Sequence, residues 1–184
     1  MPFMLTAPGW LHPARHCVSP HWDERPGNEI SLLVVHCISL PPGRFGGPYI
    51  DDLFMGRLDP AGDPYFAAIY RLRVSAHCLI RRDGELVQYV PFELRAWHAG
   101  LSCFAGRDQC NDFSVGIELE GTDSGGYTDE QYRVLAEVSR LLMQAYPAIT
   151  PERITGHSDI APGRKTDPGP GFDWARFRAM LSAG

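Results

Sequence analysis

Residues 31–38, SLLVVHCI, form a short apolar run rich in β-branched side chains. Such a run predicts a buried strand, and its period of two places alternate residues on the same face. One face therefore carries Leu32, Val34, His36 and Ile38. His36 is a polar ring on an otherwise apolar strand, so it must find a partner or lose free energy on burial.

A second strand is predicted at residues 113–120, FSVGIELE, because apolar and small or polar residues alternate there. The apolar face holds Phe113, Val115, Ile117 and Leu119. The opposite face holds Ser114, Gly116, Glu118 and Glu120. The small residues at 114 and 116 predict room for a substrate beside Glu118.

Turn and capping residues mark three further features. Asp83-Gly84 lies between two strand-like runs, at 74–82 and 85–90, and predicts a β-hairpin. Thr128 and Gln131 form a capping-box pattern, and apolar residues then follow at helical spacing up to Pro147. A final helix is predicted after Asp173, and YIDDLF at 49–54 is a weaker helical segment.

These elements predict a single domain over residues 1–184, because no repeat or flexible linker divides the chain. Residues 1–30 read as an irregular N-terminal arm packed on that domain. The Pro- and Gly-rich stretch that follows the first strand is long, as in lids and binding walls. The order of strands and helices predicts an α+β fold, a central mixed β-sheet flanked by helices.

Composition excludes several classes of protein. The net charge of -5 excludes a nucleic-acid binder held by a basic surface. No apolar stretch approaches the ~20 residues of a membrane span, and the N-terminus lacks the pattern of a signal peptide. Five cysteines without a CxxC pair argue against a disulfide framework and a thiolate zinc site. We therefore expect a cytoplasmic protein.

Histidine and aspartate residues suggest a metal site, although spacing alone leaves alternatives open. His36 is as consistent with a hydrogen-bonded core histidine as with a ligand. In the segment GHSDIAPGRKTDPGP, His157 and Asp167 could bind one ion, yet Asp159 and Asp167 could equally be turn residues. His77 and His98 are weaker candidates for ligands.

A hydrolytic zinc site also needs a proton shuttle and a group that stabilises developing charge. Glu118 is the candidate shuttle, and Glu120 is its rival on the same face. Sixteen of the 17 basic residues are Arg, and Lys165 is the one Lys. Codon bias can explain this composition; the alternative is that position 165 requires a compact ammonium.

Several segments together resemble the zinc-dependent N-acetylmuramoyl-L-alanine amidases of the type-2 amidase and peptidoglycan-recognition-protein family. They are SLLVVHCISLPPGRFGG, DPYF, VSAHCLIRRDGELVQYVPF, RAWHAG, CNDFSVGIELEGTD, YTDEQY and GHSDIAPGRKTDPGPGFDWARF. The resemblance extends from about residue 10 to residue 178, which is nearly the whole chain.

The resemblance implies a role for each candidate. It implies that one zinc ion per chain is held by His36, His157 and Asp167, that Glu118 is the acid/base, and that Lys165 stabilises an oxyanion. It further implies that the substrate groove is bordered by Tyr65, Arg73, Trp97, His98 and Ala99. Cys37 departs from the family pattern, in which Asn commonly follows the first His.

The implied activity is hydrolysis of the amide between the lactyl group of anhydro-N-acetylmuramic acid and L-Ala. The implied substrate is an anhydro-muropeptide of cytoplasmic peptidoglycan recycling, whose removal lowers the signal for β-lactamase induction. We expect a monomer with no nucleic-acid or membrane partner. The alternatives are a non-catalytic peptidoglycan-recognition module, disfavoured because all three candidate ligands are present, and a periplasmic cell-wall amidase, disfavoured by the N-terminal sequence.

Overall fold

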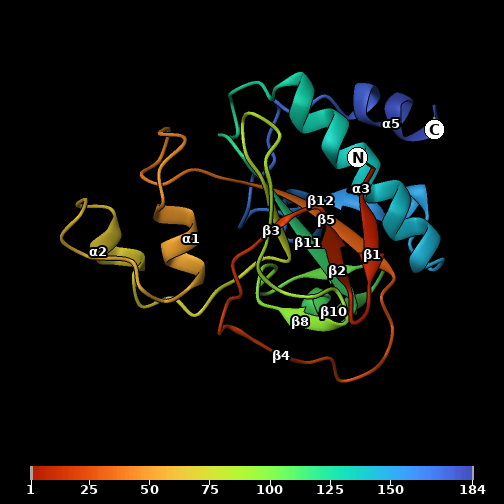
Figure 1. Ribbon diagram of the computed structural model, residues 1–184, viewed down its shortest axis with the longest axis horizontal. Coiled ribbons are helices and arrows are strands. Elements are labelled where there is room, and N and C mark those ends of the chain that lie inside the picture. The colour runs from red at the N-terminus through yellow and green to blue at the C-terminus, as the bar shows by residue number, and fades with distance from the viewer. Residues whose placement is uncertain (1, 184) are drawn as a thin grey trace.

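The chain folds around a central six-stranded β-sheet (Figure 1). The computed structural model describes residues 2–183, so the first and last residues of the predicted domain 1–184 lie outside the described residues. No helix within residues 2–183 has the length and hydropathy needed to cross a membrane. The predicted mixed sheet flanked by helices is confirmed.

The strands of the central sheet are β3 (Arg15–His16), β5 (Leu32–Ile38), β6 (Cys78–Ile80), β7 (Leu86–Gln88), β11 (Ser114–Glu120) and β12 (Ile154–Gly156). Three two-stranded sheets pair β1 (Met4–Thr6) with β2 (Trp10–His12), β4 (Trp22–Glu24) with β8 (Leu94–Ala96), and β9 (Cys103–Phe104) with β10 (Arg107–Asp108). The α-helices are α1 (Tyr49–Phe54), α2 (Phe66–Ile69), α3 (Asp129–Ala145), α4 (His157–Ile160) and α5 (Trp174–Ser182). Two short 3-10 helices cover Cys110–Asp112 and Pro151–Arg153.

Strands β12, β5, β11 and β6 run parallel to one another. Strand β7 is antiparallel to β6 across the predicted Asp83-Gly84 turn, where Gly84 has a φ of +88° that favours glycine. Because neighbouring strands are parallel, the carboxyl ends of β12, β5 and β11 meet at the same edge of the sheet. In open α/β sheets this edge is the usual place for ligands.

Helices α3 and α5 lie together on one face of the sheet (Figure 1). Leu33, Val35 and Ile117 point toward this face and pack with Val138 of α3 and Phe177 of α5. The predicted capping box at the start of α3 is formed, and Asp173 caps α5 by accepting a hydrogen bond from the backbone N–H of Arg176. The other face therefore presents the alternate residues of β5 and β11, which include His36 and Glu118.

The N-terminal arm is more ordered than the sequence predicts. It contributes strands β1 to β4, and β3 pairs with β7 at the edge of the central sheet. Leu11 is completely buried in the hydrophobic core, and its backbone N–H donates to the side chain of Gln88 in β7. His21 is also buried and hydrogen-bonds the carbonyl of Val74. Pairing with β7 and β8, which are distant in the sequence, therefore orders this arm.

Helices α1 and α2 extend to one side of the sheet (Figure 1). They belong to the long Pro- and Gly-rich segment, and α1 forms at the predicted YIDDLF. A second apolar cluster holds Leu53, Phe54 and Phe66 against Leu79 and Tyr89. This packing fixes the long segment as a wall beside the carboxyl ends of the strands.

Candidate metal centre and active site

Strand pairing brings two histidines and a glutamate to one edge of the sheet. His36 of β5 lies opposite Glu118 of β11 in the parallel register. Gly156, the last residue of β12, lies opposite Val35, so His157 follows directly beside His36. His36 and His157 are buried, with 1% and 4% of their surface exposed.

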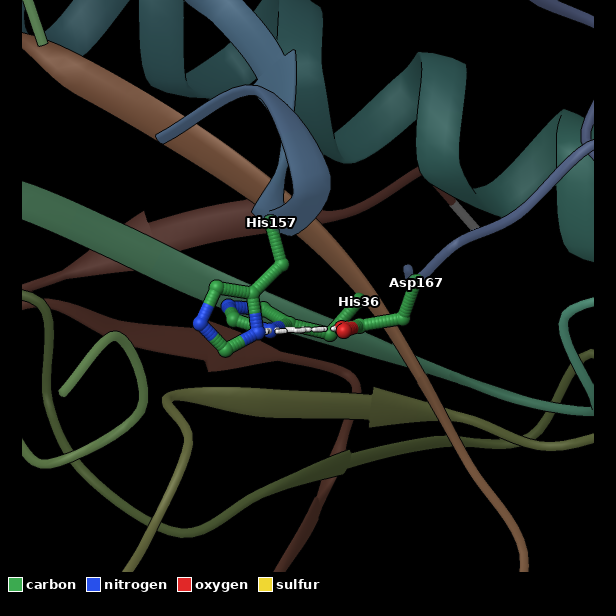
Figure 2. A group of neighbouring side chains, drawn as sticks. All are labelled: His36, His157 and Asp167. Carbon is green, nitrogen blue, oxygen red and sulfur yellow. Dashed lines mark hydrogen bonds and ion pairs between the residues drawn. The ribbon is translucent and has the colours of Figure 1, made fainter. Parts of the chain in front are cut away.

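Asp167 completes a convergent group with the two histidines (Figure 2). The Nδ1 atoms of His36 and His157 are 3.0 Å apart. The Oδ2 atom of Asp167 lies 3.1 Å from Nδ1 of His36 and 3.2 Å from Nδ1 of His157. Asp167 comes from a loop, which is held in place because its carbonyl accepts a hydrogen bond from the N–H of Ser158.

The other ring nitrogens indicate which protons these histidines carry. Nε2 of His157 lies 3.0 Å from the carbonyl of Ala99, which can only accept, so Nε2 carries the proton. Nε2 of His36 lies 2.8 Å from Nδ1 of His98, whose own Nε2 lies 3.1 Å from Oγ of Ser114. With protons on all three Nε2 atoms, every one of these contacts is a hydrogen bond. Burial lowers the pKa of His36 to about 4, which favours its neutral form.

This assignment leaves unshared electron pairs on the two Nδ1 atoms, directed toward a carboxylate oxygen. Three atoms that each carry an unshared electron pair repel one another unless a cation lies between them. In a tetrahedral zinc site with bonds of 2.0–2.1 Å, donor atoms are about 3.3 Å apart. The observed separations of 3.0–3.2 Å are close to this value, so the donor set fits a zinc ion.

The two rival carboxylates have other partners. Asp159 accepts hydrogen bonds from the N–H of Gly156 and the hydroxyl of Thr155, and so caps the short helix α4. Glu120 accepts from the N–H of Gly46 and pairs with Arg81. Neither is therefore available to the metal centre.

Glu118 is buried beside the metal centre. It is 8% exposed, and its Oε2 atom has no partner among the described residues. Burial, together with the charge of Asp167, raises the pKa of Glu118 well above its ordinary value, and Lys165 partly offsets this shift. An unpaired carboxylate with a raised pKa is suited to accepting and returning a proton near neutral pH.

Glu118 lines an open cleft, as expected, but the ring of His98 fills the space over Gly116 and Ser114. A Cβ atom on Gly116 would lie only 2.4 Å from Cγ of His98. Gly116 is thus small because a side chain of the same protein packs against it. Nδ1 of His98 accepts a hydrogen bond from Nε2 of His36 and so orients the ring of His36, as partners of metal-ligating histidines commonly do.

The metal centre lies in a cleft of about 690 Å³ that Lys165, Tyr65, Trp97 and His98 also line. Tyr65 and Trp97 are 46% and 36% exposed, so both offer aromatic surface at the opening.

Arg73 and Ala99 differ from the other residues predicted at the groove. Arg73 is exposed and is not among the described residues that line the cleft. Ala99 is completely buried; its N–H donates to Asn111 and its carbonyl accepts from His157. For both, substrate contact stays a prediction.

Sequence reasoning overlooked Asp123 and Arg164, which also line the cleft. Asp123 follows the β11 strand within the segment GTD, and Arg164 directly precedes Lys165. The sequence indicates both residues only by their distance along the chain, since each lies within five residues of Glu118 or Lys165. Cys37, the departure from the family pattern, donates from Sγ to Oδ1 of Asp123 at 3.3 Å.

Comparison with known proteins shows that this chain is similar to amidases. A family model described as N-acetylmuramoyl-L-alanine amidase matches residues 26–170. The 1,6-anhydro-N-acetylmuramyl-L-alanine amidase AmpD of Citrobacter freundii is 66% identical over 180 residues, covering 97% of this chain and 96% of that protein. The AmpD of Haemophilus influenzae is 58% identical over 174 residues, covering 94% and 95%.

Solved structures of amidases are also similar to this chain. A crystal structure of a selenomethionine AmpD derivative has a TM-score of 0.94 and 65% identity, and it covers 97% of this chain and 99% of that one. AmpDh3 of Pseudomonas aeruginosa in complex with anhydromuramic pentapeptide has a TM-score of 0.60 and 31% identity, covering 84% and 61%. The chain belongs to the N-acetylmuramoyl-L-alanine amidase family, as its motifs predicted.

Proposed function

We propose that this protein is a zinc-dependent amidase that cleaves the bond between the lactyl group of anhydro-N-acetylmuramic acid and L-Ala of the stem peptide. One observation carries the proposal: His36, His157 and Asp167 converge within 3.2 Å of one another, in the same cleft as the unpartnered carboxylate of Glu118. A hydrolytic zinc enzyme needs a set of metal ligands and a nearby group that can accept a proton, and this cleft contains both.

Zinc, when bound, supplies a Lewis acid next to the scissile carbonyl and lowers the pKa of a water to about 7. Glu118 accepts the proton as the water oxygen adds to the lactyl carbonyl carbon. The C–N bond then breaks, and Glu118 returns the proton to the amine of L-Ala. The raised pKa of Glu118 supports both transfers, because the carboxyl group can hold the proton between them.

Lys165 has the role of stabilising the oxyanion that forms on the carbonyl oxygen. It lines the cleft, and its charge reaches both His36 and Glu118, since it contributes to the pKa shift of each. An ammonium group at this position donates hydrogen bonds to the oxygen as negative charge develops.

The substrate class rests on similarity and on the cleft. The AmpD relatives are named for 1,6-anhydro-N-acetylmuramyl-L-alanine, and AmpDh3 has been solved with an anhydromuramic pentapeptide. Tyr65 and Trp97 border the opening and offer flat surfaces to a sugar ring. Action in cytoplasmic peptidoglycan recycling, and thereby control of β-lactamase induction, belongs to the same proposal.

Metal analysis combined with a single-turnover assay on anhydro-muropeptide tests the proposal. We expect one zinc per chain, release of the stem peptide, loss of activity on chelation and recovery on adding zinc. Binding of the muropeptide without cleavage would make the protein a recognition module. Turnover by the metal-free protein would overturn the zinc mechanism, and a strong preference for intact wall would indicate a cell-wall amidase.

A further inference from the structure

Residues 164–167 carry two proposed functional groups in a segment outside regular helix or strand. Lys165 and Asp167 alternate with Arg164 and Thr166. A ligand and an oxyanion donor work only if they are held within a fraction of an ångström of their positions. Something other than secondary structure must therefore fix this segment.

Arg164 fixes one side of the segment. Its guanidinium donates to the carbonyls of Ala99 and Leu101, each at 2.6 Å. Gly100 allows the close approach, because a Cβ there would lie 3.1 Å from the guanidinium and Gly100 has a φ of +59°. The loop after β8 thereby holds the residue that precedes Lys165.

Thr166 fixes the other side through Asp123. The hydroxyl of Thr166 donates to Oδ2 of Asp123, in the loop that follows β11. Thr166 lies between Lys165 and Asp167, so this one hydrogen bond restrains both of its neighbours. No other hydrogen bond of the Thr166 side chain is found among the described residues.

Asp123 is itself well anchored. Its Oδ1 accepts from Sγ of Cys37, and its backbone carbonyl accepts from the N–H of Gly171 at 3.0 Å. The backbones are in close contact here, because a Cβ on Gly169 would lie 2.2 Å from the carbonyl oxygen of Asp123. Tyr127 adds a hydrogen bond from its hydroxyl to the carbonyl of Pro168 at 2.7 Å. The two loops are therefore packed as one unit.

We infer that Asp123 is a positioning residue that holds Lys165 and Asp167 at the metal centre through the hydroxyl of Thr166. Its carboxylate joins three parts of the site: the strand that carries His36, through Cys37; the loop after Glu118, on which Asp123 lies; and the segment with Lys165 and Asp167. The inference rests on the proposed function, because it takes the roles of Lys165 and Asp167 from it.

The test is a double-mutant cycle with Thr166→Val and Asp123→Ala. Each substitution removes the same hydrogen bond, so each should weaken zinc binding, measured by chelator competition, and lower kcat by about 10-fold or more, as loss of an outer partner of a metal site typically does. The double variant should lose no more than the more impaired single variant, because the two side chains act through one bond. Thr166→Ser keeps the hydroxyl and should restore zinc affinity and kcat.

Thr150→Val is the matched control, since Thr150 lies outside the cleft lining, and it should behave as the wild type. Losses that multiply in the double variant, or a Thr166→Val protein with unchanged zinc affinity and kcat, would overturn the inference. Lys165→Ala separates the two proposals. Wild-type turnover in Lys165→Ala would contradict the proposed role of Lys165, whereas a defective Lys165→Ala beside a normal Thr166→Val contradicts the role of Asp123 alone.

Discussion

Gly116→Ala tests whether the ring of His98 controls the metal centre. The added Cβ would lie 2.4 Å from Cγ and 2.5 Å from Nδ1 of His98. Carbon atoms in contact are about 3.5 Å apart, so the ring must move by about 1 Å. A shift of that size is enough to break the 2.8 Å hydrogen bond between His98 and Nε2 of His36.

Two effects should follow from this displacement. Overpacking of this kind lowers the free energy of unfolding by about 1–3 kcal/mol, and the lost hydrogen bond adds about 1 kcal/mol. Zinc affinity should fall about 10–100-fold, because the ring of His36 loses the partner that orients it. That loss corresponds to about 1.4–2.8 kcal/mol of binding free energy.

Urea unfolding of the metal-free protein measures the first effect, and chelator competition measures the second. Gly27→Ala is the matched control, because a Cβ at Gly27 would meet nothing within 4 Å. In a His98→Ala background the stability cost of Gly116→Ala should largely disappear, since the clash is removed. The reasoning is refuted if Gly116→Ala keeps wild-type stability and zinc affinity, or if its cost is unchanged without the His98 ring.

Four further predictions concern the other residues of the site. Asp167→Ala should lose zinc and activity together, whereas Asp159→Ala should keep full zinc by metal analysis and lose about 1 kcal/mol of stability with its helix cap. Glu118→Gln should keep zinc while kcat falls at least ~10²-fold in the single-turnover assay. The pKa of Glu118 is higher in the folded protein than in the unfolded chain, so the folded protein binds this proton more tightly. The free energy of unfolding of the metal-free wild type should therefore fall, relative to that of Glu118→Gln, as pH rises above about 4.3. In acid, where Glu118 is protonated in both states, the difference should vanish. Lys165→Arg should retain zinc and fold but lose kcat nearly as much as Lys165→Ala, about 10²–10³-fold; wild-type kcat in the Arg variant would support codon bias as the explanation for the single Lys.

Local sequence determined the elements and the faces of their residues. The period of two in β5 and β11 placed His36 and Glu118 on the face away from α3, because side chains of a strand alternate strictly. The capping pattern at Thr128 set the start of α3, since the Thr128 hydroxyl accepts a hydrogen bond from the backbone N–H of Gln131, three residues later. These predictions were correct because the interactions behind them span a few residues.

Tertiary structure decided which of the candidate carboxylates could act at the metal centre. Asp159 and Asp167 both follow His157 in the same turn-rich segment, yet one caps a helix and the other faces the histidines. Glu118 and Glu120 share a face, yet only Glu120 meets Arg81. Asp167 meets His36 and Glu120 meets Arg81, partners far away in the chain, so no local pattern could contain these two outcomes.

The same limit explains the space over Gly116. Sequence could say that Gly116 is small, but the ring that fills the space belongs to His98, 18 residues away in the chain and brought close by packing. The sequence by itself determined which chemical groups the protein has and the strand face on which two of them lie. Only the parallel register of β12, β5 and β11 brought His157, His36 and Glu118 together, because hydrogen bonds between strands, rather than order along the chain, set these distances.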